Sequence, residues 1–522
     1  MNIGVFVFID LDYNPILSEE IDNKAIYKWM IEKCGLLNEK IIILTTTDER
    51  NQELLDFAAQ NSIDVYIGRK ELIEVEFDSY VYGITPKNGM EDGVMQFYIE
   101  AAQKYNIDTI IKINGGSLFF DIGSTKGMLD FHIKQGYEYT EISERHYFLQ
   151  GIFPEIVNLE TLMKFANREG VFKYRRGNVL NFIAKHQTKS VRKGYFALND
   201  ESLKKTFVNL YIDFKWKLDF IRRILAGKKL DLTMFDAHYA LERLDDYFSF
   251  PRHIIVEPTR KCLLNCYMCP RRELEAQNGE LTFEMFVDIV EQVKDKSTVI
   301  EFSGFGEPML NNSLPEMVAY AKSKGLKTVV YSALTANIKF IKKVIDAGLD
   351  LLLANLLNFD PKLSLKLYNA ENYLAVYHNL NKLFGLRKEK KFNLGVTTVL
   401  HGGNKSSIMK LYNVISTQAD VVSVKNMFDF FGKIEGYKSD DFTPNKRMPC
   451  KKLLNQLFVE FDGRTNMCYY RVFDEKAKNS LQDYSIEQIW NNSVLSQNRN
   501  AQLNYDFDKD SYCKKCKEWY NA

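Results

Sequence analysis

The sequence lacks a surplus of either charge, and it also lacks long hydrophobic runs. Its 522 residues carry 69 Lys and Arg against 68 Asp and Glu, which leaves a formal net charge of +1. Nucleic acids and anionic membranes select basic surfaces, so this balance disfavours both as partners. No apolar run approaches the length that spans a bilayer, and the N-terminal apolar run meets Asp10 without a basic leader. We therefore expect a cytoplasmic protein without a signal peptide.

Cysteine is scarce in the first half of the chain. Only Cys34 precedes residue 262, and the other seven of the eight cysteines follow in two groups. In a reducing compartment, clustered cysteines are metal ligands or catalytic groups more often than disulfides. The isolated Cys34 lies in an apolar segment, where we predict a small buried hydrophobe. The seven grouped cysteines are therefore the candidates for metal binding.

The first group, Cys262, Cys266 and Cys269, has the spacing C-x3-C-x2-C. Three thiolates on so short a loop can reach one iron–sulfur cube, and the fourth iron is then open to an outside ligand. Taken alone, the motif is also compatible with a structural zinc loop or with an unliganded turn.

The spacing resembles that of the radical S-adenosylmethionine (SAM) superfamily, whose loop carries an aromatic residue directly before the last cysteine. This chain differs slightly, because Met268 occupies that position and Tyr267 lies one place earlier. Residues 303–308 resemble the family's G-G-E-P motif, which lines the methionine amino group, and residues 331–337 occupy the place of its T-N-G strand end. The resemblance implies SAM contacts from Tyr267, Ser303, Gly304, Gly306, Glu307, Ser332 and Asn337.

Residues 250–440 alternate between apolar strands and amphipathic helices, with Thr282 as an expected N-cap and Gly325 and Gly348 as helix ends. This pattern predicts a partial parallel (β/α)6 barrel with its active site at the carboxyl ends of the strands. The expected strands are His253–Glu257, Thr298–Phe302, Thr328–Tyr331, Leu349–Ala354, Phe392–Leu400 and Val421–Val424.

Residues 1–235 also alternate strands with helices, which predicts an α/β domain with a mostly parallel sheet followed by a helical connector. Residues 108–121 and 154–157 resemble sugar-nucleotide cytidylyltransferases. Gly116, however, replaces that family's metal-binding Asp, Leu118 replaces its Pro, and no Gly-rich phosphate loop follows the first strand. Because Mg²⁺-dependent nucleotidyl transfer needs both features, we expect the nucleotidyltransferase-like fold without the activity. The domain either holds a sugar or nucleotide part of a substrate or is purely structural.

Residues 441–522 contain the second cysteine group. Asp462-Gly463 predicts a hairpin between Cys450 and Cys468, and Ser485 with Gln488 predicts a capping box. The spacing resembles the SPASM and twitch extensions of radical SAM enzymes, and a two-pair zinc ribbon is the alternative. The resemblance implies one auxiliary [4Fe–4S] cluster, because the chain ends six residues after the last cysteine. Its ligands would be Cys450, Cys468, Cys513 and Cys516.

The three-part order resembles the spiro-SPASM family. That resemblance implies an enzyme that cleaves SAM reductively at a [4Fe–4S] cluster to a 5′-deoxyadenosyl radical, which abstracts hydrogen from a substrate. The first domain favours a carbohydrate- or nucleotide-linked small molecule, and a reductant such as flavodoxin or ferredoxin is the implied partner. The auxiliary cluster would transfer electrons. Alternatives are a peptide-modifying maturase, a nucleotidyltransferase with an iron–sulfur accessory domain, and a non-enzymatic metal protein.

Overall fold

The computed structural model describes most of the chain, and these residues form two compact units that divide between Tyr247 and Phe248. No helix among them is long and apolar enough to cross a membrane. The three-domain division inferred from the sequence stays a prediction, and residues 167–190 and 226–240 of the expected connector lie outside the described residues. The described ranges are 1–68, 89–143, 151–166, 191–198, 201–203, 208–225, 241–275, 278–358, 361–368, 372–387, 392–400, 404–415, 418–434, 447–475 and 478–519.

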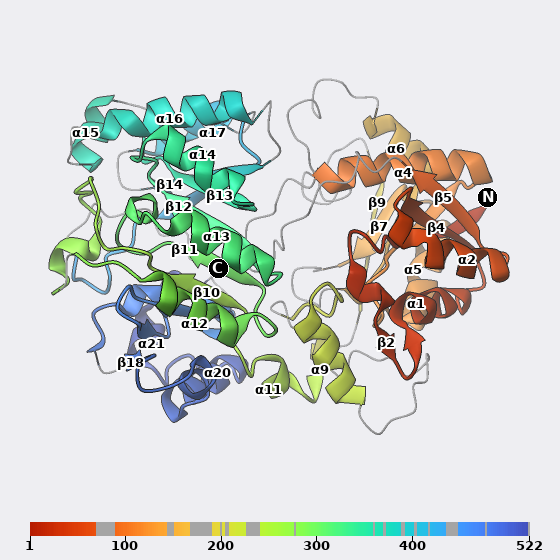
Figure 1. Cartoon of the computed structure of the whole chain (residues 1–522). Coiled ribbons are helices and arrows are strands. Elements are labelled where there is room, and N and C mark those ends of the chain that lie inside the picture. The colour runs from red at the N-terminus through yellow and green to blue at the C-terminus, as the bar shows by residue number, and fades with distance from the viewer. Residues whose placement is uncertain are drawn as a thin grey trace. The chain divides into compact units, whose positions relative to one another are not determined.

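The first unit contains a seven-stranded sheet in the order β5-β4-β1-β6-β8-β7-β9 (Figure 1). Its pairings are parallel except those of β8, which is antiparallel to both β6 and β7, so the prediction of a mostly parallel α/β sheet is confirmed. The strands are β1 (Ile3–Phe8), β4 (Lys40–Thr46), β5 (Asp64–Gly68), β6 (Thr109–Asn114), β7 (Tyr139–Ile142), β8 (Glu155–Asn158) and β9 (Lys193–Phe196), with a separate hairpin β2 (Glu20–Ile21) and β3 (Lys24–Ala25).

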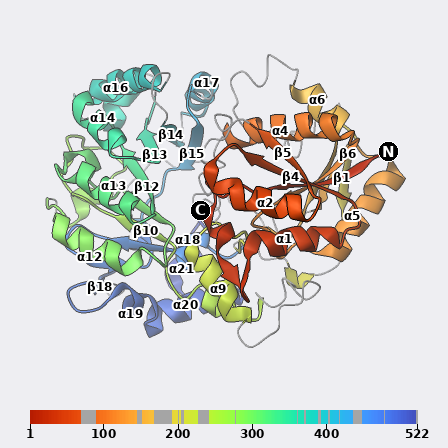
Figure 2. The ribbon, with the colours of Figure 1, turned by 45° about the vertical axis from the view of Figure 1, so that its right-hand side comes forward.

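Helices cover both faces of this sheet. Figures 1 and 2 show α4 and α6 above the strands and α1 below them. Phe6, Phe8 and Tyr139 pack under α4 and α6, and Cys34 of α1 is fully buried as predicted. The helices are α1 (Ile26–Gly35), α2 (Gln52–Gln60), α4 (Gly89–Tyr105), α5 (Ile122–Gln135), α6 (Leu159–Ala166), α9 (Lys215–Leu225) and α11 (Leu244–Tyr247).

The second unit contains a nine-stranded sheet, β15-β14-β13-β12-β11-β10-β16-β17-β18. Strands β10 to β15 are parallel and adjacent in chain order, which confirms the six predicted strands. The C-terminal region continues the same sheet, because β16 pairs in parallel with β10. The strands are β10 (His253–Val256), β11 (Val299–Phe302), β12 (Lys327–Ser332), β13 (Leu351–Asn355), β14 (Asn393–Leu400), β15 (Val421–Asn426), β16 (Gln456–Val459), β17 (Arg464–Asn466) and β18 (Asn479–Ser480).

Helix caps and turns in this unit follow the sequence signals. Thr282 caps α12 by accepting a hydrogen bond from Met285 N at 3.2 Å, and Ser485 and Gln488 form the predicted capping box. Gly463 lies in the β16–β17 turn with φ of +84°. The helices are α12 (Phe283–Val293), α13 (Leu314–Ser323), α14 (Ile338–Asp346), α15 (Pro361–Tyr368), α16 (Tyr373–Leu386), α17 (Lys405–Ile415), α18 (Lys451–Asn455), α19 (Ile486–Trp490), α20 (Ser493–Leu503) and α21 (Ser511–Lys515).

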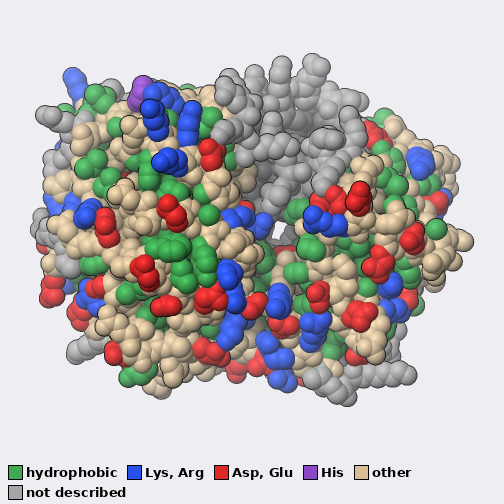
Figure 3. All heavy atoms as spheres, viewed as in Figure 1, with side chains coloured by type: hydrophobic (Ala, Val, Ile, Leu, Met, Phe, Trp, Pro, Cys, Tyr) green, Lys and Arg blue, Asp and Glu red, His purple; other side chains and the backbone are tan. Residues whose placement is uncertain are grey.

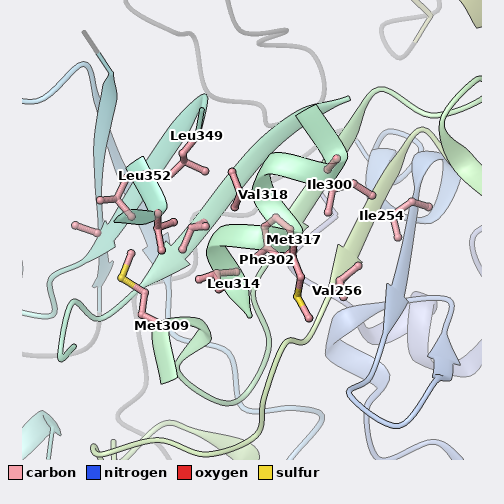
Figure 4. Packing of buried hydrophobic residues seen from close by; sticks show 14 of the residues in the cluster. Ile254, Val256, Ile300, Phe302, Met309, Leu314, Met317, Val318, Leu349 and Leu352 are labelled. Atoms are coloured by element: carbon pink, nitrogen blue, oxygen red, sulfur yellow. The ribbon is translucent and has the colours of Figure 1, made fainter. Parts of the chain in front are cut away.

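The two faces of the second sheet have different chemistry. The face that we call the outer face carries Ile254, Ile300 and Phe302, which pack with Met317 and Val318 of α13 (Figure 4). Because side chains alternate along a strand, the residues between them point to the opposite, inner face. The inner-face residues include Ile255, Glu301, Tyr331, Thr397, Lys425 and Phe458. The outer face of the sheet is thus apolar and the inner face is partly polar.

Charged side chains of both signs are mixed over the face drawn in Figure 3. Several form exposed ion pairs, such as Lys296 with Glu487 and Lys294 with Glu291. Exposed pairs of this kind contribute about 0–1 kcal/mol each, so the buried sheet–helix contacts contribute more to the stability of the fold.

The outer-face core gives a test of this architecture. Phe302 is fully buried and its ring lies 5.4 Å from that of Phe286. We expect Phe302→Ala to lower the stability of the second unit by about 3–5 kcal/mol, because a large cavity replaces the ring. Hydrogen exchange measured by mass spectrometry should quicken over β10 to β12 and remain unchanged over β1 and β4. Equal acceleration in both units would contradict the division into two units.

Candidate functional site

The first cysteine group lies on the loop that follows β10. Cys269 N donates to Cys266 O at 3.0 Å, which folds the loop back on itself. Burial, with a contribution from the neighbouring thiols, raises the pKa of Cys262 to about 11 and also raises the pKa of Cys266. Three partly buried thiols that oppose each other's ionisation need a positive centre among them to become thiolates.

A buried ion network holds the base of this loop. Arg260 is 1% exposed, and its guanidinium donates to Glu257 at 2.6 Å and to Glu460 at 2.8 Å. Glu460 belongs to the β16–β17 turn, where Lys478 also lies 3.1 Å from it. Burial raises the pKa of Glu257, and the hydrogen bonds from Arg260 and Phe305 N oppose that effect. The network therefore joins the cysteine loop to the C-terminal hairpin.

The loop after β11 packs directly on the cysteine loop. Glu307 N donates to Lys261 O at 2.8 Å. A Cβ on Gly306 would lie 2.0 Å from Thr259 O, and a Cβ on Gly304 would lie 2.5 Å from Glu257 Cγ. Both glycines are therefore required by the close approach of these two loops, whatever ligand they also contact.

The carboxylate of Glu307 joins the ends of β11 and β12. Its oxygens accept hydrogen bonds from Ser332 Oγ at 2.6 Å, Ala333 N at 2.8 Å and Met309 N at 3.1 Å. Burial raises the pKa of Glu307, which these hydrogen bonds partly offset. The structure thus brings Glu307 and Ser332 together, as expected for one site at the strand ends.

The other predicted SAM-contacting residues have separate local roles. Ser303 Oγ donates to Glu301 at 2.6 Å, and Tyr267 is 38% exposed on the cysteine loop. Asn337 is exposed and caps α14 by accepting from Lys339 N at 2.9 Å. Their contacts with SAM remain predictions.

Two features at the strand ends were missed by the sequence interpretation. Asn355, the last residue of β13, has a buried side-chain oxygen without a hydrogen-bond partner among the described residues. Leu334 has φ of +57°, and Asn379 Nδ2 holds this turn by donating to Leu334 O at 2.7 Å. Strained backbone and unpaired polar atoms are typical of ligand sites. A polar residue at the end of an apolar strand was the only signal for Asn355.

The second cysteine group converges from three segments. Cys450 precedes α18, Cys468 follows β17, and Cys513 and Cys516 lie on and directly after α21. Burial, together with the charges of neighbouring thiolates in the group, raises the pKa of Cys468 to about 11 and the pKa of Cys516 to about 12. Burial also raises the pKa of Cys513. The structure therefore brings all four predicted auxiliary ligands within electrostatic reach.

Side chains around this group fix the three segments. Arg471 pairs with Asp510 at 2.9 Å, and Asp510 caps α21 by accepting from Cys513 N at 2.9 Å. Cys450 N donates to Gln502 at 2.9 Å. Each cysteine-bearing segment is therefore anchored by groups that are not cysteines.

An aromatic cluster lies between the two cysteine groups. Tyr469 directly follows Cys468, and its ring stacks on Phe305 with centroids 4.6 Å apart. The Tyr469 hydroxyl donates to Gly304 O at 3.2 Å, within the loop that packs on the first cysteine group. Phe458 and Phe430 complete the packing around Phe305. These rings form a packed, largely buried cluster.

A single metal ion and an iron–sulfur cube place their cysteine ligands differently. Among the described side chains, no three or more His, Cys, Asp or Glu are placed to hold one metal ion. A zinc site gathers its sulfurs at about 2.3 Å from one point, whereas a cube places an iron beside each sulfur.

Two family descriptions match this unit. Residues 256–415 match the Radical SAM superfamily. Residues 450–517 match the SPASM iron–sulfur cluster-binding domain. The two matches contain all seven grouped cysteines, so the predicted cofactors, a SAM-binding cluster with an auxiliary centre, are supported by the families as well as by the site.

Individual proteins resemble only parts of the chain. A probable GTP 3′,8-cyclase of Methanococcus maripaludis is 31% identical over 24% of this chain and 42% of its own length. A PqqA peptide cyclase of Streptomyces rochei is 28% identical over 34% of this chain and 48% of its own. The chain thus spans about half the length, or less, of these curated relatives. A cytidylyltransferase structure from Leptospira borgpetersenii aligns with a TM-score of 0.38 and 18% identity, over 47% of this chain and 94% of that one.

The close contact at Gly306 gives a first test of the site. We expect Gly306→Ala to separate the two loops, because its Cβ would meet backbone atoms that cannot move independently. Iron bound after anaerobic reconstitution should fall, and the thermal midpoint should drop. Gly385→Ala is the matched control, because Gly385 lies in α16 with nothing within 4 Å of a new Cβ. The control should be neutral or stabilising by up to about 1 kcal/mol. Equal iron content in the two variants would contradict this role of Gly306.

The ion network gives a second test. Arg260→Met should lower stability by about 3–5 kcal/mol, because it leaves Glu257 buried without its cation and removes one of the cations around Glu460. A carboxyl whose pKa is raised in the folded state binds protons more tightly when folded, so lowering the pH stabilises the fold. The loss in Arg260→Met should therefore be smaller at pH 5 than at pH 8, measured by urea unfolding. A loss that does not depend on pH would indicate a packing role alone.

Proposed function

We propose that this enzyme abstracts a hydrogen atom from an organic substrate at the inner face of its β10–β15 sheet, because residues 256–415 match the Radical SAM superfamily and residues 450–517 match the SPASM domain. The single observation that carries the proposal is the convergence of the cysteine loop, the Gly304–Glu307 loop and Ser332 at the carboxyl ends of β10, β11 and β12. Parallel β/α proteins place their active sites at these ends.

The residues of the site have distinct roles in this proposal. Cys262, Cys266 and Cys269 would hold three irons of the first cluster. When bound and reduced by one electron from a flavodoxin or ferredoxin, the cluster with SAM supplies the 5′-deoxyadenosyl radical that removes the substrate hydrogen. Glu307 and Ser332 fix the two strand ends relative to each other, and Asn355 offers a buried acceptor to a bound donor.

The second cysteine group would hold the auxiliary cluster through Cys450, Cys468, Cys513 and Cys516. Four protein ligands leave no iron open to substrate, so electron transfer is its proposed role. The contact of Tyr469 with Phe305 supports that role, because it fills the space between the two groups with packed rings. The aromatic rings also keep water from a radical formed nearby.

A carbohydrate- or nucleotide-linked small molecule is the proposed substrate. The resemblance to a cyclase named for GTP supports this class. In the first unit, a Cβ on Gly116 would lie 2.4 Å from Tyr211 Cε2, so no acidic side chain fits there. That packing supports a first domain without nucleotidyl transfer. A peptide is the second candidate, favoured by the resemblance to a peptide cyclase.

The experiment that tests the proposal measures 5′-deoxyadenosine from SAM with anaerobically reconstituted, dithionite-reduced protein. We expect formation by the parent and loss in the combined Cys262→Ala, Cys266→Ala and Cys269→Ala variant, with about four fewer irons per chain. Cys34→Ala is the matched control, because Cys34 is buried in the first unit, and it should retain both iron and activity. Nucleotide sugars should raise the yield above that with short peptides. An iron-loaded parent that neither binds nor cleaves SAM would refute the proposal.

A further inference from the structure

The inner face of the second sheet carries a lysine near the carboxyl end of β15. Thr397 lies on the inner face, because its Oγ1 donates to the Tyr331 hydroxyl at 2.7 Å across the intervening strand β13. Val399 follows Thr397 by two residues and therefore shares this face. Lys425 pairs in register with Val399, and its ammonium lies 4.9 Å from the centre of the Tyr331 ring. Lys425 thus points toward the space beside the proposed active site.

A second lysine lies close to the first. The ammonium of Lys452, on α18, lies 4.8 Å from the centre of the Tyr470 ring. Lys425 lies within electrostatic reach of both Tyr470 and Lys452. Both lysines are partly buried, and within the described chain neither has a carboxylate at ion-pair distance. Glu301 acts electrostatically on Lys425, but its carboxylate is engaged by His253 and Ser303.

Two neighbouring ammonium groups without a carboxylate at ion-pair distance repel each other, and partial burial strengthens the repulsion. An anion bound between the two ammonium groups would offset this repulsion. The Tyr331 hydroxyl accepts a hydrogen bond from Thr397, so its own proton is available to a further acceptor. Two cations and a hydroxyl donor match a phosphate, which carries up to two charges and several acceptor oxygens.

We propose that Lys425, Lys452 and Tyr331 form a subsite that binds a phosphate group of the substrate. This inference rests on the proposed function and narrows its substrate class to phosphorylated small molecules. Lys425 is the residue specific to the subsite. Lys452 also acts on Cys468 and Cys516 of the second cysteine group and would serve that centre as well.

Titration of inorganic phosphate into full-length protein with its clusters reconstituted, followed by ³¹P NMR line broadening, tests the subsite. Lys425→Met keeps the apolar stem and removes the charge, and we expect about tenfold weaker phosphate binding. Lys425→Arg should retain binding. Lys339→Met is the matched control, because Lys339 is exposed on α14, and it should bind phosphate as the parent does. Acetate, monitored by ¹³C line broadening, should bind more weakly than phosphate.

Three results would overturn the subsite: no broadening by the parent, equal phosphate binding by Lys425→Met, or acetate binding as tight as phosphate binding. If Lys425 had only a structural role, the Lys425→Met variant would have a lower thermal midpoint and an unchanged phosphate affinity. Lys425→Gln replaces the Met variant if that variant does not fold.

5′-Deoxyadenosine formation by the same parent preparation separates this inference from the proposed function. Phosphate binding without SAM cleavage or SAM binding supports the subsite and refutes the function. SAM cleavage without phosphate binding supports the function and refutes the subsite.

Discussion

The pairing of Arg260 with Glu257 and Glu460 is the interaction on which the rest of the second unit depends. It joins residues 200 positions apart in the sequence, and all three side chains are almost completely buried. Burying charges is unfavourable unless each is compensated, so the cysteine loop and the C-terminal hairpin must assemble together. The hairpin strand β16 then extends the sheet in parallel with β10. The proposed binding of a cluster by one group of cysteines is therefore linked to the folding of the region that holds the other group.

The two faces of the same sheet have different roles, because one stabilises the fold and the other carries the proposed site. Its outer face packs Ile254, Ile300 and Phe302 against helices, and hydrophobic burial there supplies the larger part of the folding free energy. The inner face is consequently free to carry partly exposed polar groups such as Tyr331 and Lys425. Polar residues on a strand are tolerated because alternation confines them to one face. A substrate site of this kind needs no interruption of the core.

Much of the site was predictable from local sequence, because it depends on short spacings. The C-x3-C-x2-C loop, the Asp462-Gly463 turn and the Ser485 capping box each involve residues within a few positions, and the predicted strands appear with small changes at their ends. The sequence predicted one part of the role of Gly306 and missed another. A glycine-rich loop was expected to approach a ligand, whereas the structure shows that it first approaches the backbone of the cysteine loop.

By itself the sequence determined the seven grouped cysteines, the order of strands and helices and the identity of the residues at the strand ends. Those features follow from spacing and periodicity, which are properties of neighbouring residues. Only the tertiary structure decided that Cys450 lies within electrostatic reach of Cys513, that Glu460 shares Arg260 with Glu257, and that Lys425 lies beside Tyr331. These contacts join segments far apart in the chain, and sheet register and loop packing set them, not local patterns.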